Sequence, residues 1–307
     1  MGYTEPPWGC PVCHSALIRE SSGSASLRCI DSGHSFPIED ELPLLIPEDQ
    51  RVSVLADALD FANTWRAMGW LPAVPGDLLA LPSPPRGSRH RMEWRLKEAS
   101  LARLLALLME QGARDIADMG AGVGWLSRHV AQAGMRAYAV EPSDDPAVGL
   151  GAARILLRAG PRFGIARGVM THPPFRRRSL DAIVCNASIH YAADAMAVAR
   201  ASAECLRPGG IFYVMNTPVH HDKASASRAE RSFRRRLRNA GARGGWVDRY
   251  HHLTQGEWDD RLRETFASVR RFEVDGGFRF RVSRALKSIA LGMELASFPV
   301  YACEVAR

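Results

Sequence analysis

Three glycines at alternate positions, Gly120, Gly122 and Gly124, follow an apolar stretch that ends at Asp118. Glycine in such a loop lets the backbone turn sharply, and it lets a ligand lie against the chain without a Cβ in the way. A helix that begins near Trp125 would offer its free N–H groups to the same ligand. The residues therefore predict a strand, a glycine-rich turn and a helix that bind a nucleotide-like molecule. A tight turn that binds no ligand is the alternative.

A single acid, Glu141, closes the next predicted strand, at residues 134–140. Open α/β sheets bind ligands at the carboxyl ends of their strands, so we expect this carboxylate to hold a ribose diol. Trp125 stands where a dinucleotide fingerprint requires its third glycine, and no Gly-Lys-Ser/Thr sequence follows. The spacing therefore excludes a dinucleotide-binding loop and a P-loop.

Two more segments follow in order. Residues 179–190 read SLDAIVCNASIH, a predicted strand with Asn186 near its end, and residues 206–210 read LRPGG before the predicted strand IFYVMN. With the glycine loop and its acid, this order resembles the class I S-adenosylmethionine-dependent methyltransferases. The resemblance covers about residues 95–217. It implies an α/β, Rossmann-like sheet of seven strands, the last antiparallel, with S-adenosylmethionine as methyl donor.

The same resemblance implies which residues contact the cofactor. Asp118, the three loop glycines, Glu141 and Asn186 are the expected contacts. Many members have Gly-Asp-Ala where this chain has Gly168, Val169 and Met170, so the carboxylate that accepts from the adenine amino group is missing. Recognition of adenine by the Val169 side chain would be apolar, and the backbone N–H of Met170 is expected to assist.

A strong amphipathic helix is predicted at residues 89–111, ending at Gly112. In the family such a helix runs over the cofactor pocket. Arg95 or His90 would then reach the cofactor's carboxylate. A surface salt bridge is the alternative role of Arg95.

His190 lies just beyond the predicted fourth strand of the methyltransferase sheet, on the rim that faces the methyl group. Methyl transfer is an in-line displacement, so the protein mainly aligns the reactants and removes a proton from the acceptor where needed. His190 is the preferred general base because imidazole titrates near neutral pH. A histidine that only shapes the pocket is the alternative, and His220 and His221 are weaker candidates. No paired carboxylates follow the fourth and fifth strands, so no catalytic metal is expected.

The N-terminal segment carries a second cluster, Cys10, Cys13, Cys29 and His34, which predicts a tetrahedral structural zinc site. A four-cysteine ribbon would place its last ligand at Ser32, for which His34 is the substitute. A redox pair or a degenerate ribbon without metal are the alternatives. Residues 8–47 resemble the zinc-ribbon modules, similar to the small tRNA-methyltransferase activator protein, that stand ahead of bacterial methyltransferases.

Composition divides the chain of 307 residues further. We expect a zinc ribbon at 1–50, a helical linker with the cofactor-covering helix at 51–111, and a class I methyltransferase domain at 112–307. Residues 1–50 hold eight acids and two bases, whereas a predicted basic helical insertion at 218–263 holds eleven bases and six acids. Such a basic surface binds nucleic acid or an anionic small substrate, or is simply solvated.

These features predict transfer of a methyl group to an oxygen or nitrogen of a small molecule, such as a specialised metabolite or lipid precursor. A ribosomal-RNA nitrogen methyltransferase and a non-catalytic cofactor-binding regulatory protein are the alternatives. The longest apolar run, at 101–109, is too short to span a bilayer. With no secretory signal visible, we expect a cytoplasmic location. The sequence leaves the oligomeric state open.

Overall fold

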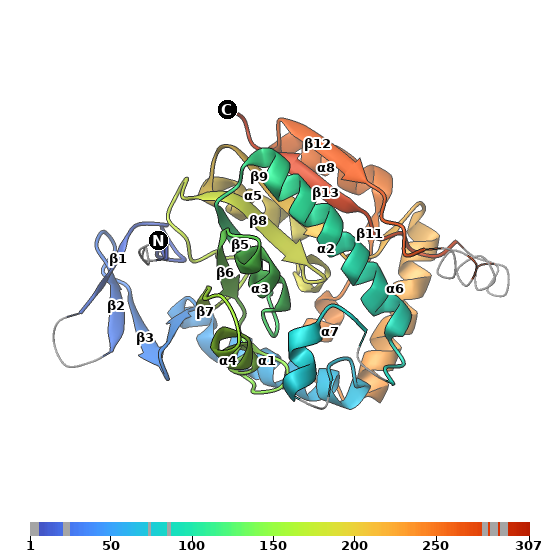
Figure 1. Ribbon diagram of the computed structural model, residues 1–307, viewed down its shortest axis with the longest axis horizontal. Coiled ribbons are helices and arrows are strands. Elements are labelled where there is room, and N and C mark those ends of the chain that lie inside the picture. Colours follow the sequence, from blue (N-terminus) through green and yellow to red (C-terminus); the bar gives the residue numbers. More distant parts are fainter. Residues whose placement is uncertain are drawn as a thin grey trace.

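The computed structural model describes residues 6–20, 25–72, 75–84, 87–277, 282, 288 and 294–307. Within these ranges, eleven strands form one sheet in the order β1-β2-β3-β4-β7-β6-β5-β8-β9-β13-β12 (Figure 1). The seven strands from β7 to β12 form the main sheet: β5 (Asp115–Met119), β6 (Arg136–Val140), β7 (Gly164–Gly168), β8 (Leu180–Asn186), β9 (Leu206–Met215), β12 (Ser268–Phe272) and β13 (Val300–Glu304). Strand β13 runs antiparallel to β9 and β12, while β7, β6, β5, β8 and β9 are parallel. The predicted α/β sheet of seven strands with an antiparallel last strand is confirmed.

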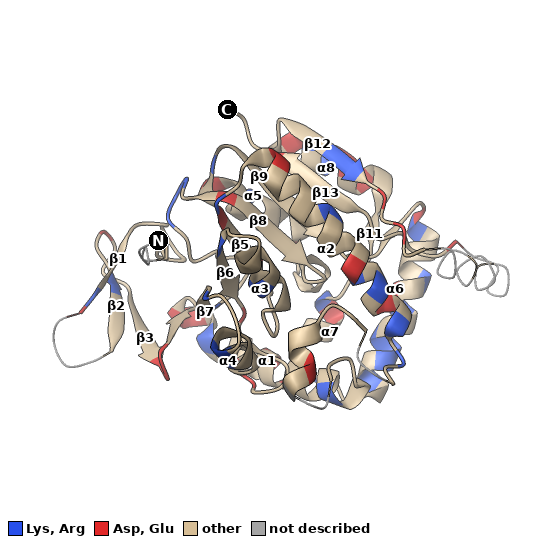
Figure 2. Ribbon diagram, viewed as in Figure 1, with Lys and Arg blue, Asp and Glu red and all other residues tan. Residues whose placement is uncertain are grey.

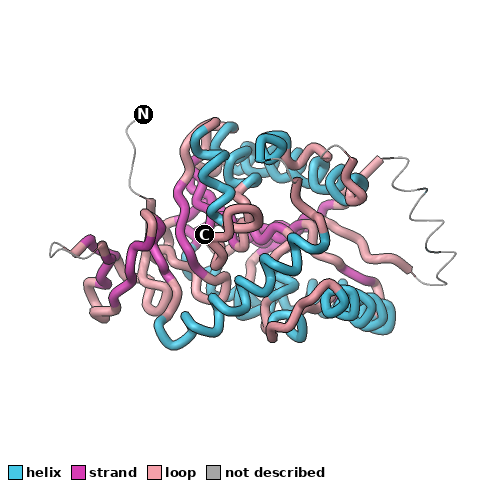
Figure 3. Tube along the Cα trace, turned by 90° about the horizontal axis from the view of Figure 1, so that it is seen from below, coloured by secondary structure: helices cyan, strands magenta, loops and turns pink. Residues whose placement is uncertain are grey.

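Helices lie on both sides of this sheet (Figure 3). They are α1 (Glu48–Met68), α2 (Arg91–Gln111), α3 (Trp125–Gln132), α4 (Leu150–Arg158), α5 (Ala195–Cys205), α6 (Lys223–Asn239), α7 (Trp246–Arg249) and α8 (Gln255–Thr265), with short 3₁₀ turns η1 (Pro75–Ala80) and η2 (Ile189–Tyr191). A two-stranded ladder of β10 (Val219–His220) and β11 (Leu253–Thr254) lies beside the main sheet. No helix in the described part of the chain is both long enough and apolar enough to cross a bilayer.

The core has two halves because successive strand residues point to opposite faces of the sheet. On one face Ile116 and Ala182 pack with apolar side chains of α2, α3 and α4. On the other face Ala117 and Ile183 pack with those of α5 and α8. The alternation leaves the carboxyl edge of the parallel strands free for a binding site.

The N-terminal strands extend the same sheet instead of forming a separate body. They are β1 (Leu17–Arg19), β2 (Ser26–Cys29), β3 (Ser35–Glu39) and β4 (Leu42–Leu45). Strand β4 pairs in parallel with β7, with Leu44 opposite Arg167 and Leu45 opposite Gly168. Trp8 packs against Phe175, with ring centroids 5.2 Å apart. The ribbon therefore covers the edge of β7, which would otherwise leave backbone groups unpaired.

Charge is distributed unevenly over this architecture. Figure 2 shows Lys and Arg gathered along α6, at the end of the molecule opposite β1–β3. Helix α6 begins at Asp222, whose carboxylate accepts from the backbone N–H of Ser225 at 2.8 Å. Seven of its residues are basic and one, Glu230, is acidic.

A buried carboxylate, Asp115, ties the start of three strands together at the edge of the sheet remote from the glycine loop. Its oxygens accept from Arg136 at 2.6 Å, from the Tyr138 hydroxyl at 2.9 Å and from Arg207 at 3.1 Å. Burial alone would raise the pKa of Asp115, but the hydrogen bonds and charges of these partners outweigh it and lower the pKa. The cluster therefore stabilises the fold only while this carboxyl is ionised.

We predict that Asp115→Asn lowers the free energy of unfolding by about 3 kcal/mol at pH 7, because two guanidinium groups lose a buried partner. A lowered folded-state pKa contributes stability above the unfolded value, near 4, and loses it as pH falls further. The difference between wild type and variant, measured by urea unfolding, should be constant from pH 6 to 8 and shrink below pH 4. Glu204→Gln, which breaks an exposed ion pair with Arg177, is the control and should cost under about 1 kcal/mol. Equal costs for the two variants would contradict the prediction.

Candidate active site

The glycine loop is held against the end of β6. The backbone N–H groups of Gly120 and Ala121 both donate to the carbonyl oxygen of Val140, at 2.8 and 3.1 Å. Gly120 has φ +73°, and a Cβ there would lie 2.5 Å from the Cβ of Ser188. Only glycine gives the backbone this conformation and this close approach without strain. The turn is therefore a cradle that a side chain would fill.

Glu141 is bound to the same loop. One of its carboxylate oxygens accepts from the N–H of Gly122 at 3.1 Å, and the other accepts from the N–H of Ser143 at 3.2 Å. Burial raises the pKa of Glu141 to about 7, although these hydrogen bonds favour the charged form. The carboxylate lines the cavity beside the loop, so it can accept hydrogen bonds from a ligand there.

Asp118 and Gly124 lie behind the loop and do not line the cavity. The Asp118 side chain is 2% exposed and accepts from the hydroxyl of Ser127 at 3.0 Å. Burial and the nearby charge of Glu141 raise its pKa to about 7. Gly124 begins α3 in the left-handed conformation. Both residues therefore support the loop from behind, and their contact with a cofactor stays a prediction.

A single cavity of about 1310 Å³ extends from the glycine loop to helices α6 and α7. This exceeds the roughly 300–1,000 Å³ of a pocket for one ligand, so a cofactor and an acceptor fit together. Helix α1 runs along one wall, and its lining side chains recur at helical spacing: Gln50, Ser53, Val54, Asp57, Ala58, Phe61, Trp65 and Met68. Its first turn meets the segment after β7, where Gln50 lies 3.5 Å from His172.

Helix α2 turns a different side chain to the cavity than the sequence suggested. Arg95 is exposed and does not line the cavity, whereas Lys97 does. The ammonium of Lys97 lies 4.5 Å from the ring centre of Trp94. Burial lowers the pKa of Lys97 to about 8, against the opposing charge of Glu93. His90 also lines the cavity, stacked on Trp70 with ring centroids 3.8 Å apart.

Val169 and Met170 line the cavity in the turn after β7, and Met170 packs against the apolar cluster that includes Met119 and Val140. The terminal methyl of Met170 would lie 3.3 Å from a Cβ at Gly120. Asn186, at the end of β8, lines the cavity and accepts from the side-chain amide of Asn216 at 2.8 Å. The structure thus brings Met170, Asn186 and the glycine loop to one end of the cavity.

His190 lies in η2 on the cavity wall, only 5% exposed. Its Nδ1 is 3.2 Å from the Thr217 hydroxyl. Burial, aided by the charges of His252, His251 and Lys97, lowers its pKa well below the ordinary value. The ring is therefore neutral at pH 7, and the same burial and neighbouring charges oppose its protonation. His220 also lines the cavity, within 2.9 Å of His252, whereas His221 is exposed outside it.

Aromatic side chains surround the end of the cavity beyond His190. The aromatic box, as we term it, consists of Phe61, Trp65, Tyr191, Phe233, Trp246 and Tyr250. Phe61 stacks on Trp65 at 4.6 Å between ring centroids and meets Tyr191 edge-on at 5.4 Å. Sequence reasoning missed this box, although the spacing of Val54, Ala58, Phe61 and Trp65 marks one helix face.

Comparisons with known proteins identify the class. Residues 117–214, from β5 through most of β9, match the family model described as "Methyltransferase domain". The protein is an S-adenosylmethionine-dependent methyltransferase. No curated protein matches its sequence.

Solved structures show the same fold as this methyltransferase at low identity. Magnesium protoporphyrin IX methyltransferase from Synechocystis PCC 6803 is 14% identical with a TM-score of 0.51, over 83% of this chain and 99% of that one. Phosphoethanolamine N-methyltransferase 2 from Haemonchus contortus is 14% identical with a TM-score of 0.50, over 67% and 53%. A chain from a complex of the Haloferax volcanii Trm112 methyltransferase activator with a methyltransferase is 14% identical, with a TM-score of 0.50 over 82% and 97%.

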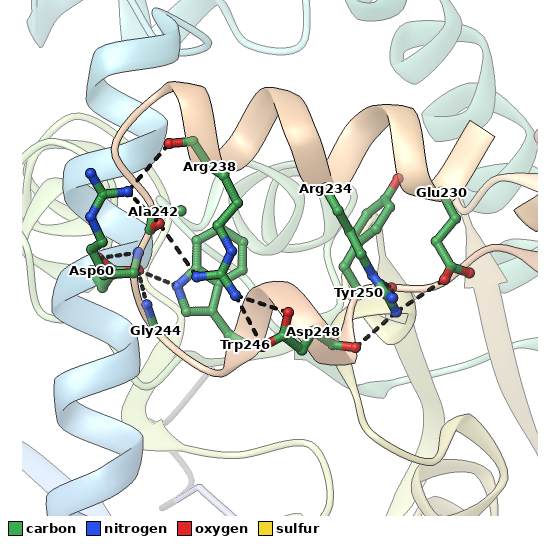
Figure 4. A network of polar contacts seen from close by, with 10 residues as sticks. Asp60, Glu230, Arg234, Arg238, Ala242, Gly244, Trp246, Asp248 and Tyr250 are labelled. Carbon is green, nitrogen blue, oxygen red and sulfur yellow. Dashed lines mark hydrogen bonds and ion pairs between the residues drawn. The ribbon is translucent and has the colours of Figure 1, made fainter. Parts of the chain in front are cut away.

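The carboxylate of Asp60 joins helix α1 to the loop between α6 and α7, which forms part of the cavity wall (Figure 4). Asp60 of α1 accepts from the backbone N–H groups of Arg243 and Gly244 and from the indole N–H of Trp246, at 2.6 to 3.1 Å. Burial alone would raise the pKa of Asp60, but these donors lower it. Asp60 thereby holds the α6–α7 loop against α1 and fixes Trp246 within the aromatic box.

Three thiols converge in the N-terminal ribbon. The sulfur atoms of Cys10, Cys13 and Cys29 all lie within 4.8 Å of one another, and Cys13 and Cys29 are 3.5 Å apart. Nδ1 of His34 is 3.6 Å from the sulfur of Cys10 and 2.6 Å from the hydroxyl of Ser32. Two ligands bound to zinc at about 2.3 Å on a tetrahedron are separated by about 3.8 Å. The spacing of the three thiols therefore suits a zinc ion, whereas His34 is not within the same distance of all three sulfur atoms.

His14 is directed away from this cluster. Its Nδ1 lies 2.9 Å from the carbonyl oxygen of Phe175 and 3.6 Å from the sulfur of Cys205. It therefore links the ribbon to the methyltransferase sheet, and the geometry leaves His34 and Ser32 as the candidates for a fourth ligand.

We predict that Gly120→Ala lowers the free energy of unfolding by at least about 2 kcal/mol, because a Cβ collides with Ser188 in addition to the left-handed strain. Gly112→Ala is the matched control, since Gly112 has φ +68° but open space around its Cβ position. It should cost only about 1 kcal/mol. Urea unfolding measures both, and calorimetry with S-adenosylhomocysteine should show weaker binding for Gly120→Ala alone. Equal effects of the two substitutions would show that the close approach is unimportant.

Proposed function

We propose that this methyltransferase transfers the methyl group of S-adenosylmethionine to an oxygen or nitrogen of a small molecule held in the aromatic box. The observation that carries the proposal is the single cavity that joins the glycine loop to the box, with His190 on the wall between them. A box of packed aromatic rings suits a molecule with an apolar body.

The cradle fits the cofactor. Glu141 would accept from its ribose hydroxyls, Met170 and Val169 would pack on the adenine, and the Lys97 ammonium would pair with its carboxylate. When bound, the cofactor supplies an electrophilic methyl carbon on a sulfonium that is its own leaving group. The residues of the chain supply alignment of that carbon with the acceptor.

His190 is the proposed general base. Its neutral imidazole would take the proton that the acceptor oxygen or nitrogen loses when it is methylated. The contact between Nδ1 and the Thr217 hydroxyl orients the ring. If the acceptor loses its proton before the methyl transfer, or needs no base, His190 only shapes the cavity wall.

The fold does not choose the acceptor, because the related structures named above are a porphyrin methyltransferase and a phosphoethanolamine methyltransferase. The proposal of a small-molecule acceptor therefore rests on the aromatic residues that line the cavity. Ribosomal RNA is disfavoured by the acidic ribbon, which repels phosphate. Salt-dependent binding of ribosomal-RNA fragments, measured by gel shift, would favour the RNA alternative.

We also propose that the ribbon holds one structural zinc ion through Cys10, Cys13, Cys29 and His34. Protein purified without chelator should contain about one equivalent by metal analysis. Cys13→Ser and Cys29→Ser should lose the metal, because each removes a thiolate ligand.

His34→Ala should lower zinc affinity, whereas His14→Ala, the control, should retain the metal because its ring is turned away. Less than half an equivalent of zinc in the wild-type protein would reject the site. Retention of zinc by His34→Ala would assign the fourth position to another ligand.

We predict that Glu141→Gln weakens binding of S-adenosylhomocysteine by about 1.5–3 kcal/mol at pH 8, measured by calorimetry, because a charged acceptor for the ribose diol is lost. The pKa of Glu141 in the free site is about 7. Below it the carboxyl is protonated, so wild-type affinity should rise from pH 6 to pH 8, and the rise should be smaller in the variant.

Asp118, with a pKa of about 7, and Lys97, with a pKa of about 8, both remain in that variant, so any residual pH dependence is assigned to these two groups. Unchanged affinity in Glu141→Gln would remove the residue from the cofactor site. No binding of either S-adenosylmethionine or S-adenosylhomocysteine by the wild-type protein would reject the proposed function and favour a regulatory protein without catalysis.

A further inference from the structure

The wall of the aromatic box carries arginines as well as rings, and their placement restricts the chemistry of the acceptor. We propose that the acceptor is an aromatic molecule with an anionic group, whose rings lie in the box and whose carboxylate or phosphate oxygens meet Arg228 and Arg236. This inference rests on the proposed function and deepens it by naming the class of the acceptor.

The box is built to hold flat rings. Tyr191 packs against Tyr250 at 5.2 Å and against Trp246 at 5.9 Å between ring centroids, and Phe233 packs against Tyr250 at 4.6 Å. Trp246 is fixed by Asp60, so the walls are held before a ligand enters. Aromatic rings pack well on such preformed walls, in offset or edge-on contacts.

Helix α6 turns one face to the cavity, and this face carries both arginines. Arg228, Ala229, Ser232, Phe233 and Arg236 recur at the spacing of one helix face, and all of them line the cavity. Arg228 and Arg236 are two turns apart, or about 12 Å along the helix. The guanidinium carbon of Arg236 lies 4.8 Å from the ring centre of Phe233, which holds it at the edge of the box.

These two arginines differ from their neighbours on the same helix. Arg234 pairs with Glu230 at 3.0 Å, and Arg238 pairs with Asp248 at 2.8 Å. Both arginines also donate to backbone carbonyl oxygens, so they serve the fold. Within the described ranges of the chain, no carboxylate lies within ion-pair distance of Arg228 or Arg236. Two exposed arginines without acidic partners therefore line the cavity.

Each acidic residue that lines the cavity already has a partner or a cation nearby within the protein. Asp57 pairs with Arg249, Glu141 accepts from the glycine loop, and Glu93 lies near Lys97. An aromatic box also suits a quaternary ammonium ion. Here the surplus positive charge of Arg228 and Arg236 opposes a cation and favours an anion. Arginine is suited to planar carboxylate and phosphate oxygens because its fork donates two parallel hydrogen bonds.

The position of His190 sets the length of the acceptor. Three successive contacts, of 5.4, 4.6 and 4.8 Å, lead from His190 through Tyr250 and Phe233 to the guanidinium of Arg236. The nucleophile would lie near His190 and the anionic group near Arg236. The acceptor therefore has a rigid aromatic body of a few rings, with the methylated atom and the acid at opposite ends.

Calorimetry on the full chain saturated with S-adenosylhomocysteine tests this proposal. The probes are 2-naphthoate, 2-naphthyl phosphate, neutral 2-naphthol and 2-naphthyltrimethylammonium, which share one ring system. At low salt and pH 7.5, at least one anionic probe should bind about fivefold or more tightly than 2-naphthol, and the preference should shrink as salt is added. Whichever anion binds more tightly distinguishes a carboxylate from a phosphate acceptor.

Arg228→Ala and Arg236→Ala should each remove most of the preference for the anion while leaving 2-naphthol binding unchanged, and Arg236→Lys should be intermediate. Arg235→Ala is the matched control, because this exposed arginine of the same helix does not line the cavity. It should behave as wild type. Thermal melts check that each variant is folded, which the exposure of both arginines favours.

Three results would overturn the proposal: 2-naphthol or the ammonium probe binding as tightly as the anions, loss of both arginines leaving the preference intact, or no binding of any naphthalene probe. If S-adenosylhomocysteine itself does not bind, the proposed function fails as well. If it binds and the anion preference is absent, only the class of acceptor is rejected.

Discussion

The active site depends on one backbone contact, in which the N–H groups of Gly120 and Ala121 share the carbonyl oxygen of Val140. This contact fixes the glycine loop to the end of β6 and places the Glu141 carboxylate against the N–H of Gly122. Because the loop lies directly against Ser188, it also sets the position of the segment that carries His190. The same contact therefore positions both the glycine loop and the part of the cavity wall that carries His190.

A second constraint holds together the cavity wall that α1, α6 and α7 form. The wall opposite the sheet comes from α1, which precedes the methyltransferase sheet in the chain, and from α6 and α7, which follow β9. Such a wall closes only if these segments are fastened to each other. Asp60 fastens them by accepting from three donors, two backbone N–H groups and one indole N–H. These donors lower the pKa of Asp60 against the opposing effect of its burial.

The N-terminal ribbon is joined to the same sheet by strand pairing and by side-chain contacts. Pairing of β4 with β7 extends the sheet to the residues just before Val169 and Met170, and His14 joins the ribbon to Phe175 and Cys205. The three cysteines therefore belong to a module that adds strands to the sheet edge beside the cavity.

The sequence by itself determined the features that are local along the chain. The glycine spacing, the acid after the next strand and the apolar strands with their helices between them were sufficient to predict the seven-stranded sheet, because each of these signals lies within one strand–turn–helix unit. The cysteine spacing likewise predicted that three thiols lie close together, and the structure places them within 4.8 Å of one another. The assignment of catalytic and cofactor roles to individual residues remains a prediction.

Only the tertiary structure decided what depends on contacts between distant segments. On α2 it selected Lys97, not Arg95, as the cation that faces the cavity, since the orientation of a helix is set by what packs against it. It showed Asp118 and Gly124 as supports behind the loop. It assembled the aromatic box from residues 61 to 250, and it separated the arginines of α6 into those that pair within the fold and those that face the cavity. Local periodicity marks which residues share a helix face, but packing alone determines what that face meets.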